Sequence, residues 1–396
     1  MSREIIMGID VGTSNVKVVV MEKNSETALP RVLSTGLSVS QGLRRGYIVN
    51  PAETANSIRD AVAQAKKSAN LNIKNAFISI GGAGLQGVHS KGSVLVSRAD
   101  HEISENDQKR SISQSEAQLN RNSSSYLLNR EILHIFPVSY KIDGEQIMGD
   151  PVGMKGEKLE TETFLITYPS QHLSNLIKSM ELAGVTIDDA IAKPWAMSHT
   201  LLNRQEKEVG SLLINIGGDT STIIVFEEGV PISSEVFPFG SNHITYDIAR
   251  GFQVPLQEAE ELKLSYDSDS SIKRKLTNII EPRLSDIFEL VEAHLDKINR
   301  VGLLPAGIII TGGGANLPRI DEIAKKALSL PVQLCQPRFC DDPKFTVTNP
   351  IWSVATGVCL ANLSGKENSE RRGITSKNIG TGAKKVIFNW FKKLLP

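Results

Sequence analysis

A short glycine turn near the N-terminus holds the first residues whose types could do chemistry. It contains Gly12, Thr13, Ser14 and Asn15, and Lys17 follows it. Backbone N–H groups of such a turn form an anion-binding concavity, to which hydroxyl groups add donors and a lysine adds positive charge. The turn therefore predicts a polyphosphate site, and an ordinary strand hairpin is the alternative interpretation.

Two further glycine turns occur later in the chain. The second contains Asn215, Gly217, Gly218, Asp219 and Thr220, and the third contains Gly312, Gly313 and Gly314. In the third turn the missing side chains would let a flat base lie against the backbone. Asp10, just before the first turn, adds a carboxylate that could hold a hydrated Mg²⁺ ion through water. Each turn alone is a weak signal, and their order and spacing make the set specific.

β-Forming runs flank the first two turns. Residues 5–10 and 16–21 surround the first turn, and residues 211–227 form a strand, a turn and a strand around the second. The second occurrence follows the first by roughly 200 residues, and one internal repeat is too few for a solenoid. The pattern therefore predicts two related lobes with a cleft between their turns.

Helical and strand-like runs alternate over most of the chain, which predicts an α/β fold. The predicted strands are residues 31–38, 76–80, 186–192 and 306–310, and the predicted helices are 51–69, 170–183, 194–203 and most of 246–303. Between about 84 and 163, strand-like runs at 94–97 and 133–142 surround a polar helical stretch near 104–118. This change of pattern predicts an inserted α+β subdomain.

The composition limits the classes of function. The chain has 396 residues, more than a single core supports, and its 44 basic and 44 acidic residues give no overall attraction to nucleic acid. Cys335, Cys340 and Cys359 are too few for a disulfide framework and form no CxxC zinc pair, which indicates a reducing compartment. We find no secretory leader and no apolar run of membrane-spanning length, so we expect a cytoplasmic protein.

The three turns resemble the phosphate-1, phosphate-2 and adenosine motifs of the superfamily that contains actin, the heat-shock chaperone ATPases and the sugar kinases. Segments between them resemble the FtsA family of bacterial cell-division proteins, namely residues 42–50, 78–83, 132–137 and, most specifically, 150–156. The similarity runs from about residue 5 to 362 and resumes at the tail. It implies an actin-like (ribonuclease-H-like) α/β fold with two lobes around an ATP cleft, an inserted α+β subdomain and a C-terminal amphipathic helix.

The resemblance also implies boundaries. The first lobe core would be residues 1–83 with 164–208, the insert 84–163, the second lobe core 209–245 with 304–363, the smaller helical subdomain 246–303, the linker 364–382 and the membrane-targeting helix 383–396.

Residues 259–263 resemble the AExxK helix of the superfamily, in which the glutamate and the lysine contact the ribose. Glu260 and Lys263 inherit that role. On helical geometry alone, their i, i+3 spacing would equally suit a surface ion pair.

The chain departs from the superfamily pattern at three positions. Asn215 stands where Asp is common, and Lys193 stands where many members have a glutamate before a proline. Asn is a poorer base than Asp, and a lysine cannot orient an attacking water as a carboxylate does. We therefore expect ATP binding with slow or no hydrolysis. Asp219, at a usual glycine position, could substitute electrostatically or repel phosphate, and its role stays open.

Residues 279–288 resemble the FtsA segment that receives the C-terminal peptide of the tubulin-like protein FtsZ. Arg283, helped by Lys275 and its neighbours Lys273 and Arg274, would meet acidic groups of that peptide. A solvated helix face is the alternative for the basic cluster. The family likeness further implies head-to-tail self-association into a filament and binding of other divisome proteins through the insert.

The C-terminal segment has the pattern of an in-plane membrane helix. One arc of a helix would carry Val386, Ile387, Phe388, Trp390, Phe391, Leu394 and Leu395, and the segment also carries Lys384, Lys385, Lys392 and Lys393. Aromatic and basic residues on so short a helix favour an anchor on anionic lipid, with a helix docked on the protein body as the alternative. We therefore expect a peripheral protein on the cytoplasmic face of the membrane at the division site.

Two other functional classes share parts of this pattern. A sugar or acetate kinase shares the phosphate turns, but it needs a catalytic Asp and a sugar pocket where the insert lies. A PilM-like ATP-binding scaffold of type IV pilus assembly shares the subdomain arrangement and binds a partner's N-terminal peptide. The linker and amphipathic tail after residue 363 favour FtsA over PilM.

Overall fold

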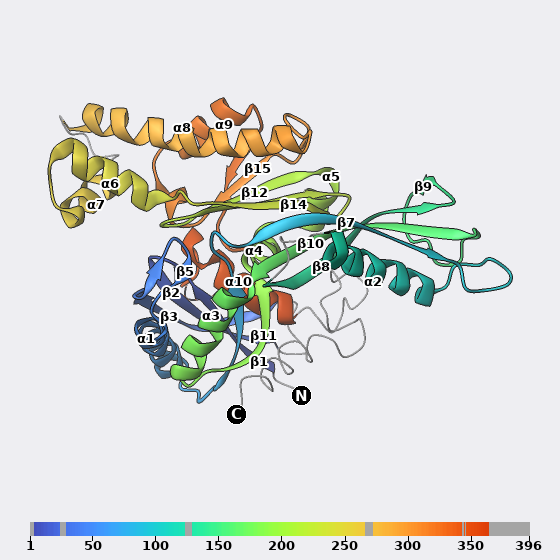
Figure 1. Cartoon of the computed structure of the whole chain (residues 1–396). Helices are drawn as coiled ribbons and strands as arrows, with labels where there is room; N and C mark the ends of the chain where they lie inside the picture. The colour runs from blue at the N-terminus through green and yellow to red at the C-terminus, as the bar shows by residue number, and fades with distance from the viewer. Residues whose placement is uncertain are drawn as a thin grey trace. The chain divides into compact units, whose positions relative to one another are not determined.

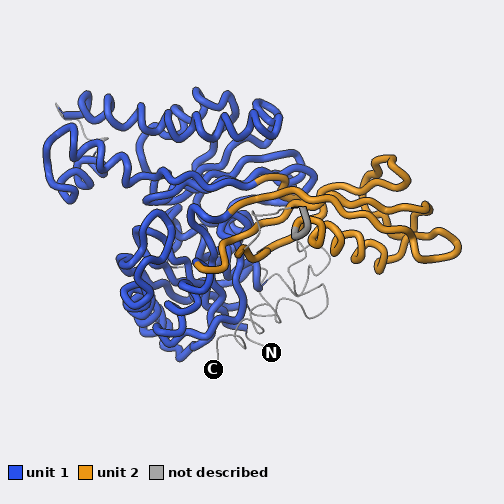
Figure 2. Tube along the Cα trace, in the orientation of Figure 1, with its two compact units in different colours: residues 1–85, 172–229, 234–366 blue, residues 86–171, 230–233, 367–396 orange. Residues whose placement is uncertain are grey.

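The computed structural model describes residues 4–23, 29–122, 129–265, 272–342, 344 and 346–363. They form two compact units, which Figure 2 distinguishes by colour. The larger unit contains the described residues within 1–85, 172–229 and 234–366, and the smaller unit contains those within 86–171 and 230–233.

The first sheet of the larger unit has the strand order β11-β6-β1-β2-β3 (Figure 1). Its strands are β1 (Glu4–Val11), β2 (Asn15–Lys23), β3 (Arg31–Val39), β6 (Asn75–Ile80) and β11 (Thr186–Ala192). The first three strands pair antiparallel, while β6 lies parallel to β1 and β11 lies parallel to β6. The central strands β1 and β2 are buried along most of their length, as expected for strands covered on both faces. The turn between β1 and β2 is the first glycine turn.

The second sheet repeats this arrangement, with the order β14-β13-β12-β15-β16. Its strands are β12 (Ser211–Ile216), β13 (Ser221–Glu227), β14 (Val230–Phe237), β15 (Ile308–Thr311) and β16 (Val332–Leu334). β12 and β13 pair antiparallel around the second glycine turn, and β15 lies parallel to β12 with β16 parallel to β15. The predicted duplication is therefore visible in the order and direction of the strands.

Helices pack on the strands of the first sheet. Helix α1 (Pro51–Ala69) packs against β2 and β3, and α10 (Ser353–Leu363) packs against β1, β2, β6 and the helix α4 (Lys193–Leu201). The crossing of α10 and α4 is close, because a Cβ on Gly357 would lie 2.1 Å from the carbonyl oxygen of Ala196. This packing holds α4, which begins where β11 ends, and so fixes the position of Lys193.

A layer of helices forms the part of the larger unit that contains residues 246–303. It consists of α6 (Ser241–Phe252), α7 (Leu256–Leu264) and α8 (Lys273–Lys297), with α9 (Ile320–Leu328) packed on α8. The remaining elements of the chain that are not in the smaller unit's sheet are β4 (Leu43–Arg44), β5 (Tyr47–Ile48), α3 (Ser170–Leu182), α5 (Arg204–Val209), η1 (Gly313–Asn316) and η2 (Pro350–Trp352).

The smaller unit is the predicted α+β insert. Its sheet has the order β7-β10-β8-β9, and α2 packs on β7 and β10. The elements are β7 (Gln86–Leu95), α2 (Glu105–Asn122), β8 (Arg130–Ile142), β9 (Glu145–Ile147) and β10 (Lys158–Pro169). The helix lies close to the sheet through buried hydroxyl groups, since Ser111 and Ser115 hydrogen-bond to Thr161 and Thr163.

One predicted strand has different bounds in the structure, and two predicted segments are not described by it. The strand expected at 94–97 is the longer β7, whose N-terminal part was missed because Ser90 and Gly92 replace apolar residues where α2 approaches. The linker at 364–382 and the amphipathic helix at 383–396 lie outside the described residues. Among the described helices, none is long and apolar enough to cross a membrane.

Candidate nucleotide site

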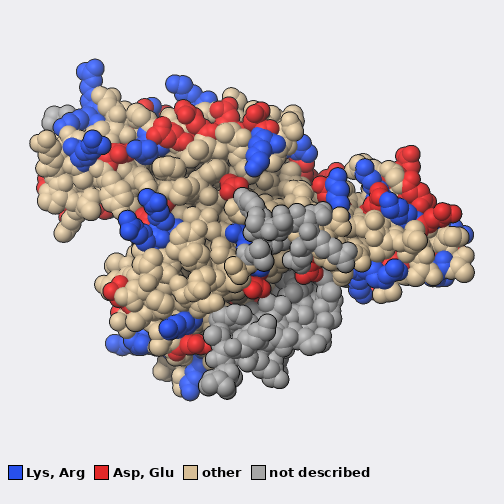
Figure 3. Space-filling model, in the orientation of Figure 1, with Lys and Arg blue, Asp and Glu red and all other residues tan. Residues whose placement is uncertain are grey.

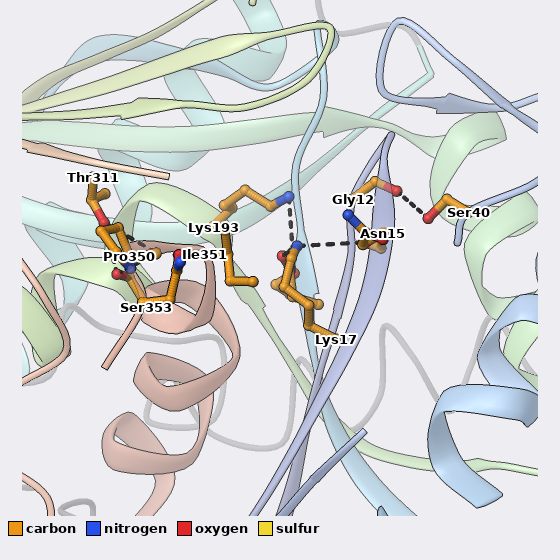
Figure 4. Close-up of polar contacts among 12 residues, drawn as sticks. Gly12, Asn15, Lys17, Ser40, Lys193, Thr311, Pro350, Ile351 and Ser353 are labelled. Atoms are coloured by element: carbon orange, nitrogen blue, oxygen red, sulfur yellow. Dashed lines mark hydrogen bonds and ion pairs between the residues drawn. The ribbon is translucent and has the colours of Figure 1, made fainter. Parts of the chain in front are cut away.

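The first two glycine turns have the same local geometry. The N–H of Gly12 donates to the carbonyl oxygen of Asn15 at 3.1 Å, and the N–H of Gly217 donates to that of Thr220 at 2.9 Å. A Cβ on Gly12 would lie 2.9 Å from the carbonyl oxygen of Asn15, and a Cβ on Gly217 would lie 2.9 Å from that of Thr220. This close approach explains why glycine opens both turns. Ser40 braces the first turn by donating from Oγ to the carbonyl of Gly12 at 2.6 Å (Figure 4).

The two turns meet within the larger unit. The backbone N–H of Asp219 donates to Oγ1 of Thr13 at 3.2 Å. A Cβ on Gly218 would lie 2.1 Å from Oγ of Ser14 and 3.0 Å from Nδ2 of Asn242. Gly218 is therefore required for the close approach of the two turns.

The third turn closes another side of the site. Gly312 has a φ of +90°, and a Cβ there would lie 2.2 Å from Oδ1 of Asn215. Just before it, Thr311 hydrogen-bonds to Oγ of Ser353 at 2.7 Å, which ties the turn to the start of α10 (Figure 4). The third turn thus lies against the second because glycine removes both a side chain and a backbone restriction.

A cavity of about 370 Å³ lies between these turns, a volume within the range of small-molecule sites. The predicted residues that line it are Asp10, Gly12, Thr13, Ser14, Asn15, Lys17, Asn215, Gly217, Gly218, Thr220, Glu260, Lys263, Gly312 and Gly313. Lys193, which was expected only as a departure from the family's hydrolysis pattern, also lines the cavity. Further lining residues that were not predicted include Thr222, Ser241, Asn242, Asn316 and Ile351. Ser241 and Asn242 could have been found as polar residues that open a helix after Gly240.

Asp219 and Gly314 were predicted in the site and are not among the residues that line the cavity. The carboxylate of Asp219 accepts from Nδ2 of Asn242 at 2.8 Å and from the backbone N–H of Arg45 at 3.3 Å. A Cβ on Gly314 would lie 2.4 Å from Cγ2 of Ile216, so this glycine serves close packing of the third turn.

The most constrained charge in the cavity is Asp10, whose side chain is 2% exposed. Its Oδ2 lies 2.8 Å from Nζ of Lys17, and its Oδ1 lies 2.8 Å from Nζ of Lys193 and accepts from Oγ of Ser79 at 2.8 Å. Figure 4 shows Lys17 and Lys193 converging from two different elements. Burial raises the pKa of this carboxyl, but the two lysines outweigh burial and hold the pKa well below its ordinary value.

These surroundings do not fit a magnesium ion as they stand. Mg²⁺ takes oxygen ligands in a nearly octahedral arrangement, whereas each oxygen of Asp10 already faces an ammonium group. In the described part of the chain, no group of three or more His, Cys, Asp or Glu side chains could hold a metal. The Mg²⁺ expectation for Asp10 stays a prediction that this arrangement does not favour.

Glu260 and Lys263 form a polar cluster at the edge of the cavity. Nζ of Lys263 lies 2.7 Å from Oε2 of Glu260 and donates to Oγ1 of Thr245 at 2.9 Å. Thr245 in turn donates to Oε2 of Glu260 at 2.6 Å. The two residues are therefore ion-paired at i, i+3, as helical geometry alone suggested, and they also line the cavity. Their contact with a ribose stays a prediction.

Arg283, the predicted contact for the FtsZ peptide, lies on α8 in the helical layer. Its Nε lies 2.6 Å from Oδ2 of Asp247 and its Nη1 lies 3.0 Å from Oδ2 of Asp286. The hydrogen bond to Asp247 raises the pKa of the guanidinium further. Lys275 lies 4.1 Å from the ring centroid of Phe252. On the face shown in Figure 3, basic and acidic side chains are interspersed over this layer. Arg283 itself is paired with two carboxylates, Asp247 and Asp286.

Comparison with known proteins identifies the family. The family model described as "Cell division protein FtsA" matches residues 212–357, and the one described as "SHS2 domain inserted in FTSA" matches residues 82–167. The cell division protein FtsA of Bacillus subtilis is 31% identical over 368 residues, which cover 87% of this chain and 82% of that protein. The chain belongs to the FtsA family. FtsA of Borreliella burgdorferi is 29% identical over 400 residues, covering 95% of each chain.

Solved structures extend the FtsA likeness to the actin-like fold. The PilM-PilN type IV pilus biogenesis complex matches with a TM-score of 0.70 at 16% identity, covering 90% of this chain and 98% of that one. MreB 5 of Spiroplasma citri bound to AMPPNP matches with a TM-score of 0.51 at 15% identity, covering 93% and 98%. At such identities the likeness shows the fold alone. This FtsA-family member is therefore an actin-like cell-division protein, and the PilM alternative has no stronger support.

Proposed function

We propose that the chain binds ATP in the cavity between its three glycine turns and, as an FtsA-family protein, tethers FtsZ filaments to the cytoplasmic membrane at the septum. The observation that carries the nucleotide part is the pair of equivalent turns, Gly12–Asn15 and Gly217–Thr220, that meet beside one cavity. Backbone donors from two turns with lysines beside them are suited to a polyphosphate.

The other parts of the nucleotide find complementary groups. The ribose hydroxyls would meet the Glu260–Lys263 cluster, and the base would lie along Gly312 and Gly313, where no side chain projects. We propose slow or absent hydrolysis, since Asn215 and Lys193 supply no carboxylate to orient a water. Mg²⁺ would arrive on the phosphates of ATP. The carboxylate of Asp10 is not free to bind the ion directly, because both of its oxygens are paired with lysine ammonium groups.

The partners follow from the family. Arg283 would exchange Asp247 and Asp286 for acidic groups of the FtsZ C-terminal peptide, with Lys275 beside it. We further propose that the chain self-associates into an actin-like filament and that other divisome proteins contact the insert at 84–163. Residues 383–396 would anchor it to anionic lipid. The larger unit would divide into the two lobe cores and the smaller helical subdomain at 246–303.

Titration of the purified protein with a fluorescent ATP analogue tests the nucleotide part. Gly218→Val places a branched side chain where even a Cβ would lie 2.1 Å from Ser14, so we expect at least about a tenfold loss of affinity. Ala52→Val, at an exposed position of α1, is the matched control and should bind like the parent. Absence of saturable binding by the parent protein would contradict ATP binding, and equal affinity of Gly218→Val would contradict this site.

A further inference from the structure

Lys193 lies at an unusual position for a lysine. It is the first residue of α4, directly after β11, and the first turn of this helix contains no acidic residue. A positive charge at a helix N-terminus is unfavourable because the N–H dipoles point their positive ends toward it. The side chain is also only 14% exposed. A specific partner must therefore offset the unfavourable placement.

That partner is Asp10, and the surrounding residues are shaped to allow the contact. The stem of Lys193 crosses Gly81, where a Cβ would lie 3.0 Å from both Cδ and Cε of the lysine. Its ammonium then lies 2.8 Å from Oδ1 of Asp10 inside the cavity. Any larger residue at position 81 would narrow the path of the side chain.

The charges of this cluster do not cancel. Asp10 contributes one negative charge, Lys17 and Lys193 contribute one positive charge each, and Ser79 adds only a donor. The cluster therefore carries a net positive charge beside the two phosphate-binding turns. A divalent cation placed against Asp10 would face two ammonium groups and would be repelled by both.

We propose that Lys193 supplies, from the protein itself, the positive charge beside the phosphates for which the site would otherwise depend on a divalent metal, so that ATP binds here with little dependence on Mg²⁺. This inference rests on the proposed ATP site and goes beyond it. Lys193 acts as a fixed charge on Asp10. The ammonium of Lys193 pairs with Oδ1 of Asp10, so this oxygen is not available to a hydrated ion.

The test compares the affinity of the full-length protein for the fluorescent ATP analogue in Mg²⁺ and in EDTA. For the parent protein we expect dissociation constants that differ by less than about threefold. Lys193→Met keeps the length of the side chain and removes the charge, and it leaves Asp10 paired with Lys17 and Ser79. In this variant we expect the loss of affinity in EDTA to reach about tenfold.

Lys178→Met, at an exposed position of α3, makes the same substitution away from the cavity and should keep the parent's ratio. If the parent protein itself loses about tenfold or more in EDTA, the inference is wrong while ATP binding stands. An unchanged ratio for Lys193→Met would also overturn it. If the parent binds in neither buffer, the proposed ATP site fails, and the inference fails with it. The parent measurement decides the question even if Lys193→Met does not fold.

Discussion

The carboxylate of Asp10, on β1, joins two other strands of the first sheet and the helix α4. Ser79 reaches it from β6, Lys17 from β2 and Lys193 from the start of α4. A carboxylate with 2% exposure needs such partners, because burying an unpaired charge is strongly unfavourable. The same pairing brings the ammonium groups of Lys17 and Lys193 to the two oxygens of one carboxylate.

Asp10→Asn should show whether this carboxylate compensates the two lysines or anchors a metal ion. Removing its charge leaves the two lysines uncompensated, so we expect ATP affinity in EDTA to rise by about tenfold and the ligand-free protein to unfold at a lower temperature. Asp60→Asn, at an exposed position of α1, is the control for the substitution. Weaker binding of ATP by Asp10→Asn in the presence of Mg²⁺ would instead assign Asp10 the role of metal anchor.

Residues of the site differed in how well the sequence predicted them. Gly12 and Gly217 were predictable because their backbone geometry is local and only glycine avoids a carbonyl 2.9 Å away. Lys193 was noticed as a departure from a family pattern, but its contact with Asp10 depends on the packing of α4 and α10. The role of Asp219 could not be decided from the sequence, because its hydrogen-bond partners, Asn242 and Arg45, lie far from it along the chain.

Elements were predicted well where their apolar pattern is periodic. Helix α1 and strand β11 have the bounds expected from the sequence, Pro51–Ala69 and Thr186–Ala192. Helix α10 was not predicted, because it is buried on nearly every side and therefore shows no amphipathic period. Strand β16, with only three residues, is too short to give a pattern.

Helix α8 contains a group that makes stability depend on pH. Burial, with a smaller effect of Lys297, lowers the pKa of His294 to about 4, and Glu235 lies 4.0 Å from its Nδ1. The pKa of a histidine in the unfolded chain is about 6.5. Between these values the unfolded state binds more protons, so the free energy of unfolding falls as the pH falls below about 6.5.

His294→Gln should remove this dependence. From pH 7 to pH 5 the parent should lose about 2 kcal/mol of stability that the variant does not lose, visible as a steeper fall of its unfolding temperature. His101→Asn changes an exposed histidine with a φ of 58°, a backbone region that asparagine tolerates. That control should keep the parent's slope. A parallel fall for His294→Gln and the parent would show that His294 does not cause the dependence.

At the scale of the whole molecule, the sequence predicted a duplicated fold with an inserted subdomain. The two five-stranded sheets share strand order and direction, and the glycine turns occupy equivalent places between their first two strands. The insert appears as a unit with its own sheet and helix. The predicted membrane anchor rests on its amphipathic pattern alone, because residues 383–396 lie outside the described part.

A tether must hold its two partners at the same time. Arg283 lies on α8 in the helical layer of the larger unit, while the lipid contact is proposed for residues 383–396, after the linker proposed at 364–382. Separate attachment points predict that each contact can be removed without the other. Arg283→Glu should abolish binding of the FtsZ peptide, and deletion of 384–396 should abolish binding to anionic vesicles, while both variants still bind ATP.

Co-sedimentation of a labelled FtsZ C-terminal peptide with anionic liposomes tests the tether most directly. With the full-length protein and ATP, we predict that peptide and protein sediment together. With Arg283→Glu the protein should sediment and the peptide should stay in the supernatant. With 384–396 deleted both should stay in the supernatant, although the deleted protein still binds the peptide in solution. Sedimentation of the deleted protein with liposomes, under conditions where it does not pellet alone, or failure of the full-length protein to bring down the peptide would contradict the account.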